Sequence, residues 1–253
     1  MGTYVITGGA SGIGLAIAEQ LRSEGHRCLS LDIQEADIVA DLSTQEGRNQ
    51  AVDAIEQQTA GELNGLVTSA GLGSHVPNKP LITSVNYFGT VELIEGLRPA
   101  LARNGAAVLL VSSNSAPMPT NPDFVAALLE GDHDRACTLA EAMEGQTVYS
   151  GSKQAVTRWM RKNTAAYAAQ GIRMNAIGPG YTRTPLSLAV EEDPVYSEAI
   201  KQFIESIPLG RAGLPQDMAD AASFLLGDRA GFICGAMLYV DGGHDAMMRP
   251  EAL

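Results

Sequence analysis

The sequence predicts a single α/β domain, spanning residues 1–253, in which a doubly wound parallel sheet is covered by helices on both faces. Short apolar runs alternate with helical patterns along the whole chain. The runs are nearly continuous, as expected for strands buried on both faces of a parallel sheet. The length of 253 residues fits one large core.

The first predicted unit is a strand ending at Ile6, a glycine-rich turn, and a helix from Leu15 onward. Gly8 suits a tight turn off the strand, Gly12 allows close approach to the backbone, and Gly14 lets the helix start lie near the sheet. The free N–H groups and positive dipole end of such a helix favour a phosphate. The unit therefore predicts a Rossmann-type dinucleotide site, although its first glycine interval is wider than in G-x-G-x-x-G.

The later elements follow the same alternation. Asp32 ends the second apolar run about twenty residues after the glycine turn, where a carboxylate can accept hydrogen bonds from ribose hydroxyls. Long helices are predicted over residues 84–101 and 149–170. Further strands are predicted at residues 38–40, 65–68, 106–111, 172–177 and 235–240.

Two segments depart from this regular alternation. Residues 117–145 begin with three prolines and continue with an alanine- and leucine-rich stretch, which predicts an inserted helical segment. Residues 181–208 are too long for an ordinary connection and are predicted to be a substrate-binding loop.

Composition excludes several classes of function. A net charge of -12 argues against a nucleic-acid partner. No apolar run is long enough to cross a bilayer, and no signal peptide precedes the first strand, so we expect a cytoplasmic protein without a membrane partner. The three cysteines and four histidines have no metal-ligand spacing, so no metal site is predicted.

Tyr149 and Lys153 are four residues apart on one predicted helix and therefore share a face. A nearby cation lowers the pKa of a tyrosine toward the range useful for acid–base catalysis. The same spacing also occurs by chance on solvated helix faces, so the surrounding motifs decide between the two interpretations.

Those motifs resemble, in order, the signature of the short-chain dehydrogenases/reductases: Thr7-Gly8-x-x-x-Gly12-Ile13-Gly14, Ser69-Ala70-Gly71, Asn86, Ser113, Tyr149-x-x-x-Lys153 and Pro179-Gly180. The resemblance covers essentially the whole chain and implies an NAD-dependent oxidoreductase. It implies that Tyr149 is the proton donor and acceptor, that Ser113 hydrogen-bonds the substrate carbonyl, and that Asn86 holds a relay water. Lys153 would bind the nicotinamide ribose and depress the pKa of Tyr149. Ser112 is the alternative for the serine role.

The resemblance also implies the cofactor contacts. They are Gly8, Ser11, Gly12, Ile13, Gly14, Asp32, Asp41, Leu42, Ala70, Gly71, Tyr149, Lys153, Pro179, Gly180 and Thr182. The family usually has Asn-Asn-Ala-Gly after the fourth strand, whereas this chain has Thr68-Ser69-Ala70-Gly71. Asp32 would repel a 2′-phosphate, and Ser11 and Ile33 offer no cation to hold one, so NAD is expected rather than NADP.

Further cues are the inserted segment before Tyr149 and the stretches Ala40-Asp41-Leu42-Ser43-Thr44, Ser84-Val85-Asn86-Tyr87-Phe88-Gly89, Asp241-Gly242-Gly243 and Met248-Arg249-Pro250. Within the family, these features resemble the bacterial 3α-hydroxysteroid dehydrogenase/carbonyl reductase subgroup. The expected substrate is a bulky apolar ketone or secondary alcohol, with 3-keto and 3α-hydroxysteroids first. Apolar side chains of the substrate-binding loop are expected to cover it: Leu186, Leu188, Val190, Val195, Phe203 and Ile204. The alternatives are a dehydrogenase for a terpenoid or aryl carbinol, and a non-catalytic NAD-binding sensor.

Many members of this family form tetramers through the two long helices. The inserted segment lies between those helices in sequence and would obstruct that contact. We therefore expect a homodimer formed through the last helix and strand.

Overall fold

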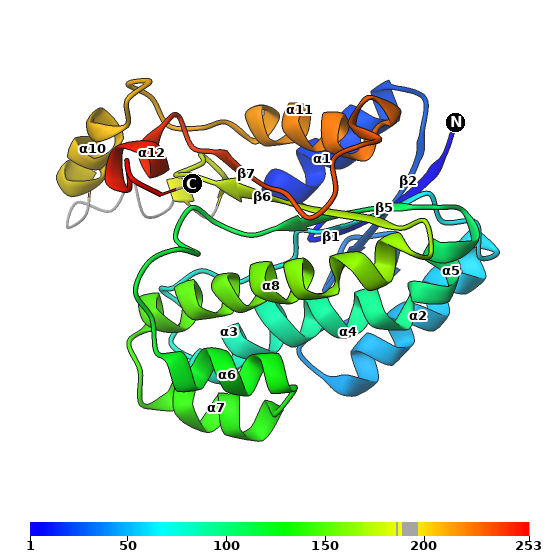
Figure 1. Ribbon diagram of the computed structural model, residues 1–253, viewed down its shortest axis with the longest axis horizontal. Coiled ribbons are helices and arrows are strands. Elements are labelled where there is room, and N and C mark those ends of the chain that lie inside the picture. The colour runs from blue at the N-terminus through cyan, green and yellow to red at the C-terminus, as the bar shows by residue number, and fades with distance from the viewer. Residues whose placement is uncertain (186, 189–196, 253) are drawn as a thin grey trace.

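The computed structural model describes residues 1–185, 187–188 and 197–252. These residues form a seven-stranded sheet in the order β3-β2-β1-β4-β5-β6-β7, in which every neighbouring pair is parallel. Helices cover both of its faces (Figure 1). The predicted doubly wound α/β fold is confirmed.

The strand order explains where a ligand can bind. The strands are β1 (Thr3–Thr7), β2 (Arg27–Asp32), β3 (Ile38–Val39), β4 (Gly65–Thr68), β5 (Ala107–Val111), β6 (Arg173–Pro179) and β7 (Met237–Val240). The chain builds outward from β1 to β3 and then restarts with β4 on the other side of β1. This reversal opens a crevice at the carboxyl ends of β1 and β4, where open α/β sheets bind ligands.

Helices lie in separate layers on the two faces of the sheet (Figure 1). On one side, α1 (Gly12–Ser23) and α11 (Pro215–Leu226) pack together, burying Ile17 and Met218. On the other side are α2 (Gln45–Thr59), α4 (Gly89–Gly96) and α8 (Gly145–Ala168). Their apolar stripes, including Ile55, Leu93 and Met160, are fully buried against the sheet.

The helix predicted over residues 84–101 is wrong as a single helix. The chain runs instead through α3 (Lys79–Thr83), a π-helical turn (Ser84–Phe88), α4 and α5 (Arg98–Arg103). Pro99 in the first turn of α5 has no N–H to continue the ladder from α4. The π turn is closed by the N–H of Gly89 and the carbonyl of Ser84, one residue further along than in an α-helix.

The inserted segment forms a helical hairpin of α6 (Pro122–Glu130) and α7 (His133–Glu141). Asn121 caps α6 by accepting from the N–H groups of Asp123 and Phe124. The hairpin packs against α8 and α3 (Figure 1). Two short helices lie near the carboxyl end of the sheet, α10 (Ser197–Ser206) and α12 (His244–Met248).

Candidate active site

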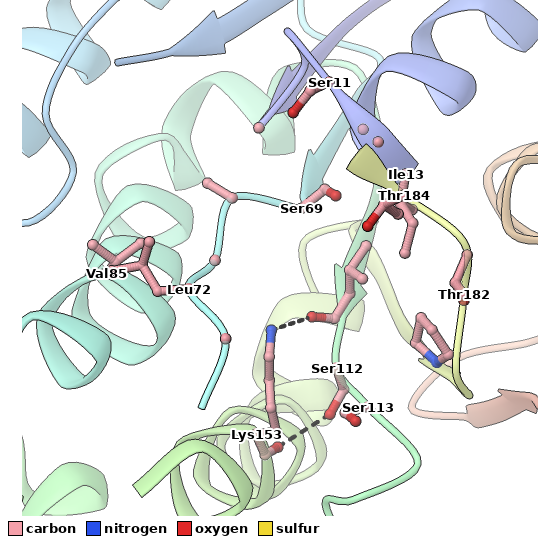
Figure 2. A pocket seen from close by; sticks show the side chains of 18 of the residues that line it. Ser11, Ile13, Ser69, Leu72, Val85, Ser112, Ser113, Lys153, Thr182 and Thr184 are labelled. Atoms are coloured by element: carbon pink, nitrogen blue, oxygen red, sulfur yellow. Dashed lines mark hydrogen bonds between the residues drawn. The ribbon is translucent and has the colours of Figure 1, made fainter. Parts of the chain in front are cut away.

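A cavity of about 560 Å³ lies at the carboxyl ends of the strands (Figure 2). This volume is within the range typical of small-molecule and cofactor sites. Sixteen of the residues predicted from the sequence line it: Gly8, Ser11, Gly12, Ile13, Gly14, Asp32, Asp41, Leu42, Ala70, Gly71, Ser113, Tyr149, Lys153, Pro179, Gly180 and Thr182. Asn86 is the predicted residue that does not line it.

The glycine turn has a shape that side chains would prevent. Gly8 and Gly12 have φ of +66° and +54°, which favours glycine. A Cβ on Gly14 would collide with the carbonyl of Gly8, so α1 can start against the turn only with glycine there. Within the described residues, the side chain of Ser11 makes no capping hydrogen bond to α1. The helix therefore presents its first N–H groups to the cavity, which suits a pyrophosphate.

Asp32 stands beside this turn at the end of β2. Its Oδ2 accepts from the N–H of Ala10 at 3.1 Å, and its Oδ1 accepts from the N–H of Ile33 at 2.8 Å. These bonds hold the carboxylate in place and leave each oxygen a further lone pair for a ribose hydroxyl. Asp41 also lines the cavity, and its carboxylate accepts from the N–H of Ser43 at 2.9 Å.

Lys153 lies on α8 with only 6% of its surface exposed. Its Nζ donates to the carbonyl of Val111 at 2.9 Å, as Figure 2 shows. Burial lowers the pKa of Lys153 to about 8, because the charged ammonium loses water. At neutral pH the side chain is therefore a cation held in place by this hydrogen bond. It begins to lose its proton as the pH rises toward 8.

The two serines after β5 point to different places. Ser112 donates to the carbonyl of Lys153 at 3.1 Å and is hydrogen-bonded to Thr157, so its hydroxyl docks β5 on α8 (Figure 2). Ser113 accepts from the N–H and the hydroxyl of Ser115 at 3.1 and 3.0 Å. Its own hydroxyl lies beside Tyr149 and acts to lower the pKa of that phenol. The geometry therefore favours Ser113 over Ser112 as the serine beside the tyrosine.

The ionisation of Tyr149 differs from the expectation that Lys153 depresses its pKa. Loss of water raises the pKa of Tyr149 above 10, and the neighbouring hydroxyl of Ser113 works against this increase. The Nζ of Lys153 lies 5.8 Å from the centroid of the tyrosine ring. In this structure desolvation is the larger effect, so Tyr149 holds its proton firmly.

Asn86 lies in the π turn and is completely buried. Its Oδ1 accepts from the N–H of Leu72 at 2.7 Å, and its Nδ2 donates to the carbonyl of Leu72 at 3.0 Å. The side-chain amide thus fixes the loop after β4, and Leu72 lines the cavity. A relay water would have to be held by another atom of this residue.

At another side of the cavity, β6 finishes at Pro179 and the chain turns through Gly180. A Cβ on Gly180 would lie 2.7 Å from the Cβ of Asp241, so the turn requires glycine. The hydroxyl of Thr182 donates to the carbonyl of Gly180 at 3.0 Å. This buried threonine therefore belongs to the same turn and lines the cavity.

Sequence reasoning missed several lining residues. Gln146 lies three positions before Tyr149 on α8, so the helical spacing could have indicated it. Val85 and Thr184 carry no sequence signal for the site. They reach the cavity only through the π turn and through the loop after β6.

Only part of the predicted substrate-binding loop can be placed. Leu186, Val190 and Val195 lie outside the described residues. Leu188 and Phe203 are each 39% exposed, and Phe203 lines the cavity, whereas Ile204 is half-buried.

Two kinds of feature are absent from the described part of the chain. No three acidic, histidine or cysteine side chains there gather in a way that could hold a metal ion. No helix there has both the length and the apolar character to cross a membrane.

Comparisons with known proteins identify the family of this chain. A family model described as short chain dehydrogenase matches residues 3–126, and one described as enoyl-(acyl carrier protein) reductase matches residues 136–245. The chain is 40% identical to 3-alpha-hydroxysteroid dehydrogenase/carbonyl reductase of Comamonas testosteroni, covering 99% of both chains. It is 31% identical to cis-4-hydroxycyclohexanecarboxylate dehydrogenase of Sinomonas cyclohexanicum, covering 96% of both.

The fold is similar to the crystal structure of the 3-alpha-hydroxysteroid dehydrogenase from Pseudomonas sp. B-0831 complexed with NADH. The TM-score is 0.94 at 44% identity, covering 99% of this chain and 100% of that chain. Both the Comamonas and the Pseudomonas enzymes align with 99% of this chain. The chain therefore belongs to the short-chain dehydrogenase/reductase family of oxidoreductases.

Proposed function

We propose that this enzyme interconverts a bulky apolar secondary alcohol and the corresponding ketone with NAD as its cofactor. One observation carries the proposal: the neighbouring hydroxyls of Ser113 and Tyr149 share a cavity with Lys153, the glycine turn and Asp32. The cavity therefore combines proton-donating groups with a phosphate- and ribose-binding end.

In the reducing direction, the substrate carbonyl oxygen would accept hydrogen bonds from Tyr149 and Ser113. Because burial raises its pKa, Tyr149 is protonated at neutral pH and can act as the general acid. The two bonds that Ser113 accepts from Ser115 leave its own proton free to be donated. When NAD is bound, its nicotinamide supplies the hydride chemistry.

The chain's own groups fit this cofactor. The first N–H groups of α1 would hold the pyrophosphate, and Lys153 and Tyr149 would hold the nicotinamide ribose. The Asp32 carboxylate would accept from the adenosine ribose and repel a 2′-phosphate, which favours NAD over NADP. The similar Pseudomonas enzyme was crystallised as a complex with NADH, which supports the same choice.

An aromatic side of the cavity supports an apolar substrate. The rings of Tyr181 and Phe203 lie 6.0 Å apart, and Phe203 lies 5.0 Å from the ring of His244. Tyr181 and Phe203 both line the cavity. The names of the similar proteins, two of which refer to 3-alpha-hydroxysteroids, favour 3-keto and 3α-hydroxysteroids as the first substrates to test.

Oxidation of NADH by the purified protein, measured with steroid, terpenoid, aryl and short-chain ketones, tests the proposal. We expect the highest kcat/KM with a 3-ketosteroid. A higher kcat/KM with a terpenoid or aryl ketone would instead assign the enzyme to that substrate class. NADH binding without turnover of any ketone would indicate a sensor and overturn the enzymatic proposal.

We also infer a homodimer formed through the β7 side of the molecule. The α6–α7 hairpin lies beside the amino-terminal half of α8 and would hinder pairing there (Figure 1). Around the edge strand β7, Phe232 is fully exposed, and Phe224 and Leu238 are 38% and 41% exposed. A second copy could cover these side chains about a twofold axis. A tetrameric mass by light scattering would contradict the inference.

We place the enzyme in the cytoplasm. Cys28, Cys137 and Cys234 are all free thiols in the structure, and such thiols persist in reducing compartments. Imaging of a tagged chain in its own cell tests this placement, and a secreted product would contradict it.

A further inference from the structure

The π turn is an unusual support for a residue of the active site. A π-helical turn is rare, occurs mostly as a single turn within an α-helix, and is frequently found at a functional site. Here the turn begins at Ser84, ends at Phe88, and carries Asn86 on its central position. The contacts at the two ends of the turn therefore bear on the position of Asn86.

His133, the first residue of α7, contacts both ends of the π turn. Its Nε2 is hydrogen-bonded to the hydroxyl of Ser84 at 2.9 Å. Its ring packs edge-on against the ring of Phe88, with 4.8 Å between centroids and 61° between planes. Cys137, one helical turn later on α7, lies within 4.0 Å of the Ser84 hydroxyl and of His133. The inserted hairpin thus contacts the π turn through one face of α7.

The π turn in turn holds the loop beside Lys153. The amide of Asn86 makes two hydrogen bonds to the backbone of Leu72. Next to Leu72, a Cβ on Gly71 would lie 3.2 Å from the Oδ1 of Asn86 and 3.5 Å from the Nζ of Lys153. A shift of Asn86 would therefore move the cavity wall that faces the lysine.

The other helix of the hairpin holds the second element of the site. Phe124 on α6 is fully buried, and a Cβ on Gly151 would lie 2.8 Å from its ring. Gly151 follows Tyr149 by two residues on α8. The hairpin is therefore in contact with both helical segments that carry predicted catalytic side chains.

We propose that His133 is a positioning residue for the reaction, which sets the geometry of the π turn and, through Asn86, of the loop at residues 71–73. This inference rests on the proposed oxidoreductase function. It gives the inserted hairpin a role in turnover in addition to any effect on assembly.

Four variants test the proposal: His133→Ala, Ser84→Ala, the double variant, and His133→Gln, which keeps a donor and acceptor group at the end of the side chain. The matched control is Arg135→Ala on the same helix, because its guanidinium bonds Glu130 within the hairpin. Two quantities are measured for each: kcat and KM with NADH and the best ketone, and hydrogen exchange of the Leu72 amide. The exchange rate does not depend on turnover.

The free energy of one lost hydrogen bond and ring contact corresponds to a change of about three- to tenfold in kcat. We expect His133→Ala and Ser84→Ala to lower kcat by that factor, to leave the KM for NADH within about twofold, and to speed exchange of the Leu72 amide. The double variant should be no worse than the poorer single variant, because both remove the same contact. His133→Gln should recover most of the loss, and Arg135→Ala should resemble the wild type.

Unchanged kcat and unchanged Leu72 exchange in both single variants would overturn the proposal, and so would additive losses in the double variant. A wild-type protein that turns over no ketone would instead defeat the proposed function. In that case faster Leu72 exchange in His133→Ala would still support the positioning contact, and unchanged exchange would overturn it.

Discussion

Replacing Lys153 by methionine should make the folded protein more stable while abolishing turnover. The ammonium is buried, and its pKa is lowered from 10.5 to about 8 by loss of water. At roughly 1.36 kcal/mol per pKa unit, this shift corresponds to a cost of about 3 kcal/mol for keeping the folded lysine charged at neutral pH. Methionine removes that cost but also the hydrogen bond to Val111, which contributes about 1 kcal/mol. The net gain in the free energy of unfolding at pH 7 is therefore about 2 kcal/mol.

The stability that Lys153→Met gains over the wild type should decrease as the pH rises. The pKa is lower in the folded chain, so between about pH 8 and pH 10.5 the unfolded chain binds the proton more tightly. The stability of the wild type relative to Lys153→Met therefore rises with pH through this window, and the advantage of the variant disappears near its upper end. Below pH 8 the full advantage remains.

Urea unfolding at pH 7 and at pH 10 measures this difference. Trp159 is the one tryptophan of the chain and is 6% exposed, so its fluorescence reports the loss of the core. Comparing variant with wild type at each pH cancels the other titrating groups. A variant less stable than the wild type at pH 7, or a gap that does not narrow by pH 10, would refute the desolvation argument.

Four other substitutions test the site. Tyr149→Phe should lower kcat by about 10²–10⁴, since it removes the proton donor, while the Kd for NADH measured by fluorescence stays within about twofold; substantial turnover would show that another acid operates. Ser113→Ala should lower kcat by about 10²-fold, whereas Ser112→Ala should lower the midpoint of thermal unfolding and leave kcat near wild type; the reverse pattern would assign the role to Ser112. Asp32→Ser should improve kcat/KM with NADPH relative to NADH by about tenfold, and an unchanged ratio would remove Asp32 from cofactor selection.

The sequence by itself determined the strand–turn–helix entry and the placement of Tyr149 and Lys153 on one helix face. These features are local: Gly8 and Gly12 are required by backbone sterics at positive φ, and Gly14 by the close start of α1. Tyr149 and Lys153 share a face because an α-helix repeats every 3.6 residues. Continuous apolar runs then predicted a parallel sheet, because burial on both faces leaves no polar alternation.

Tertiary structure decided what those side chains can do. The burial of Lys153 and the raised pKa of Tyr149 depend on atoms brought together from separate strands and helices, so no spacing in the sequence encodes them. The same is true of Asn86, whose amide is taken by the backbone of Leu72. The π turn that carries it contacts His133, which follows Ser84 by 49 residues in the chain. Desolvation and long-range packing are properties of the assembled core, and for that reason only the structure reveals them.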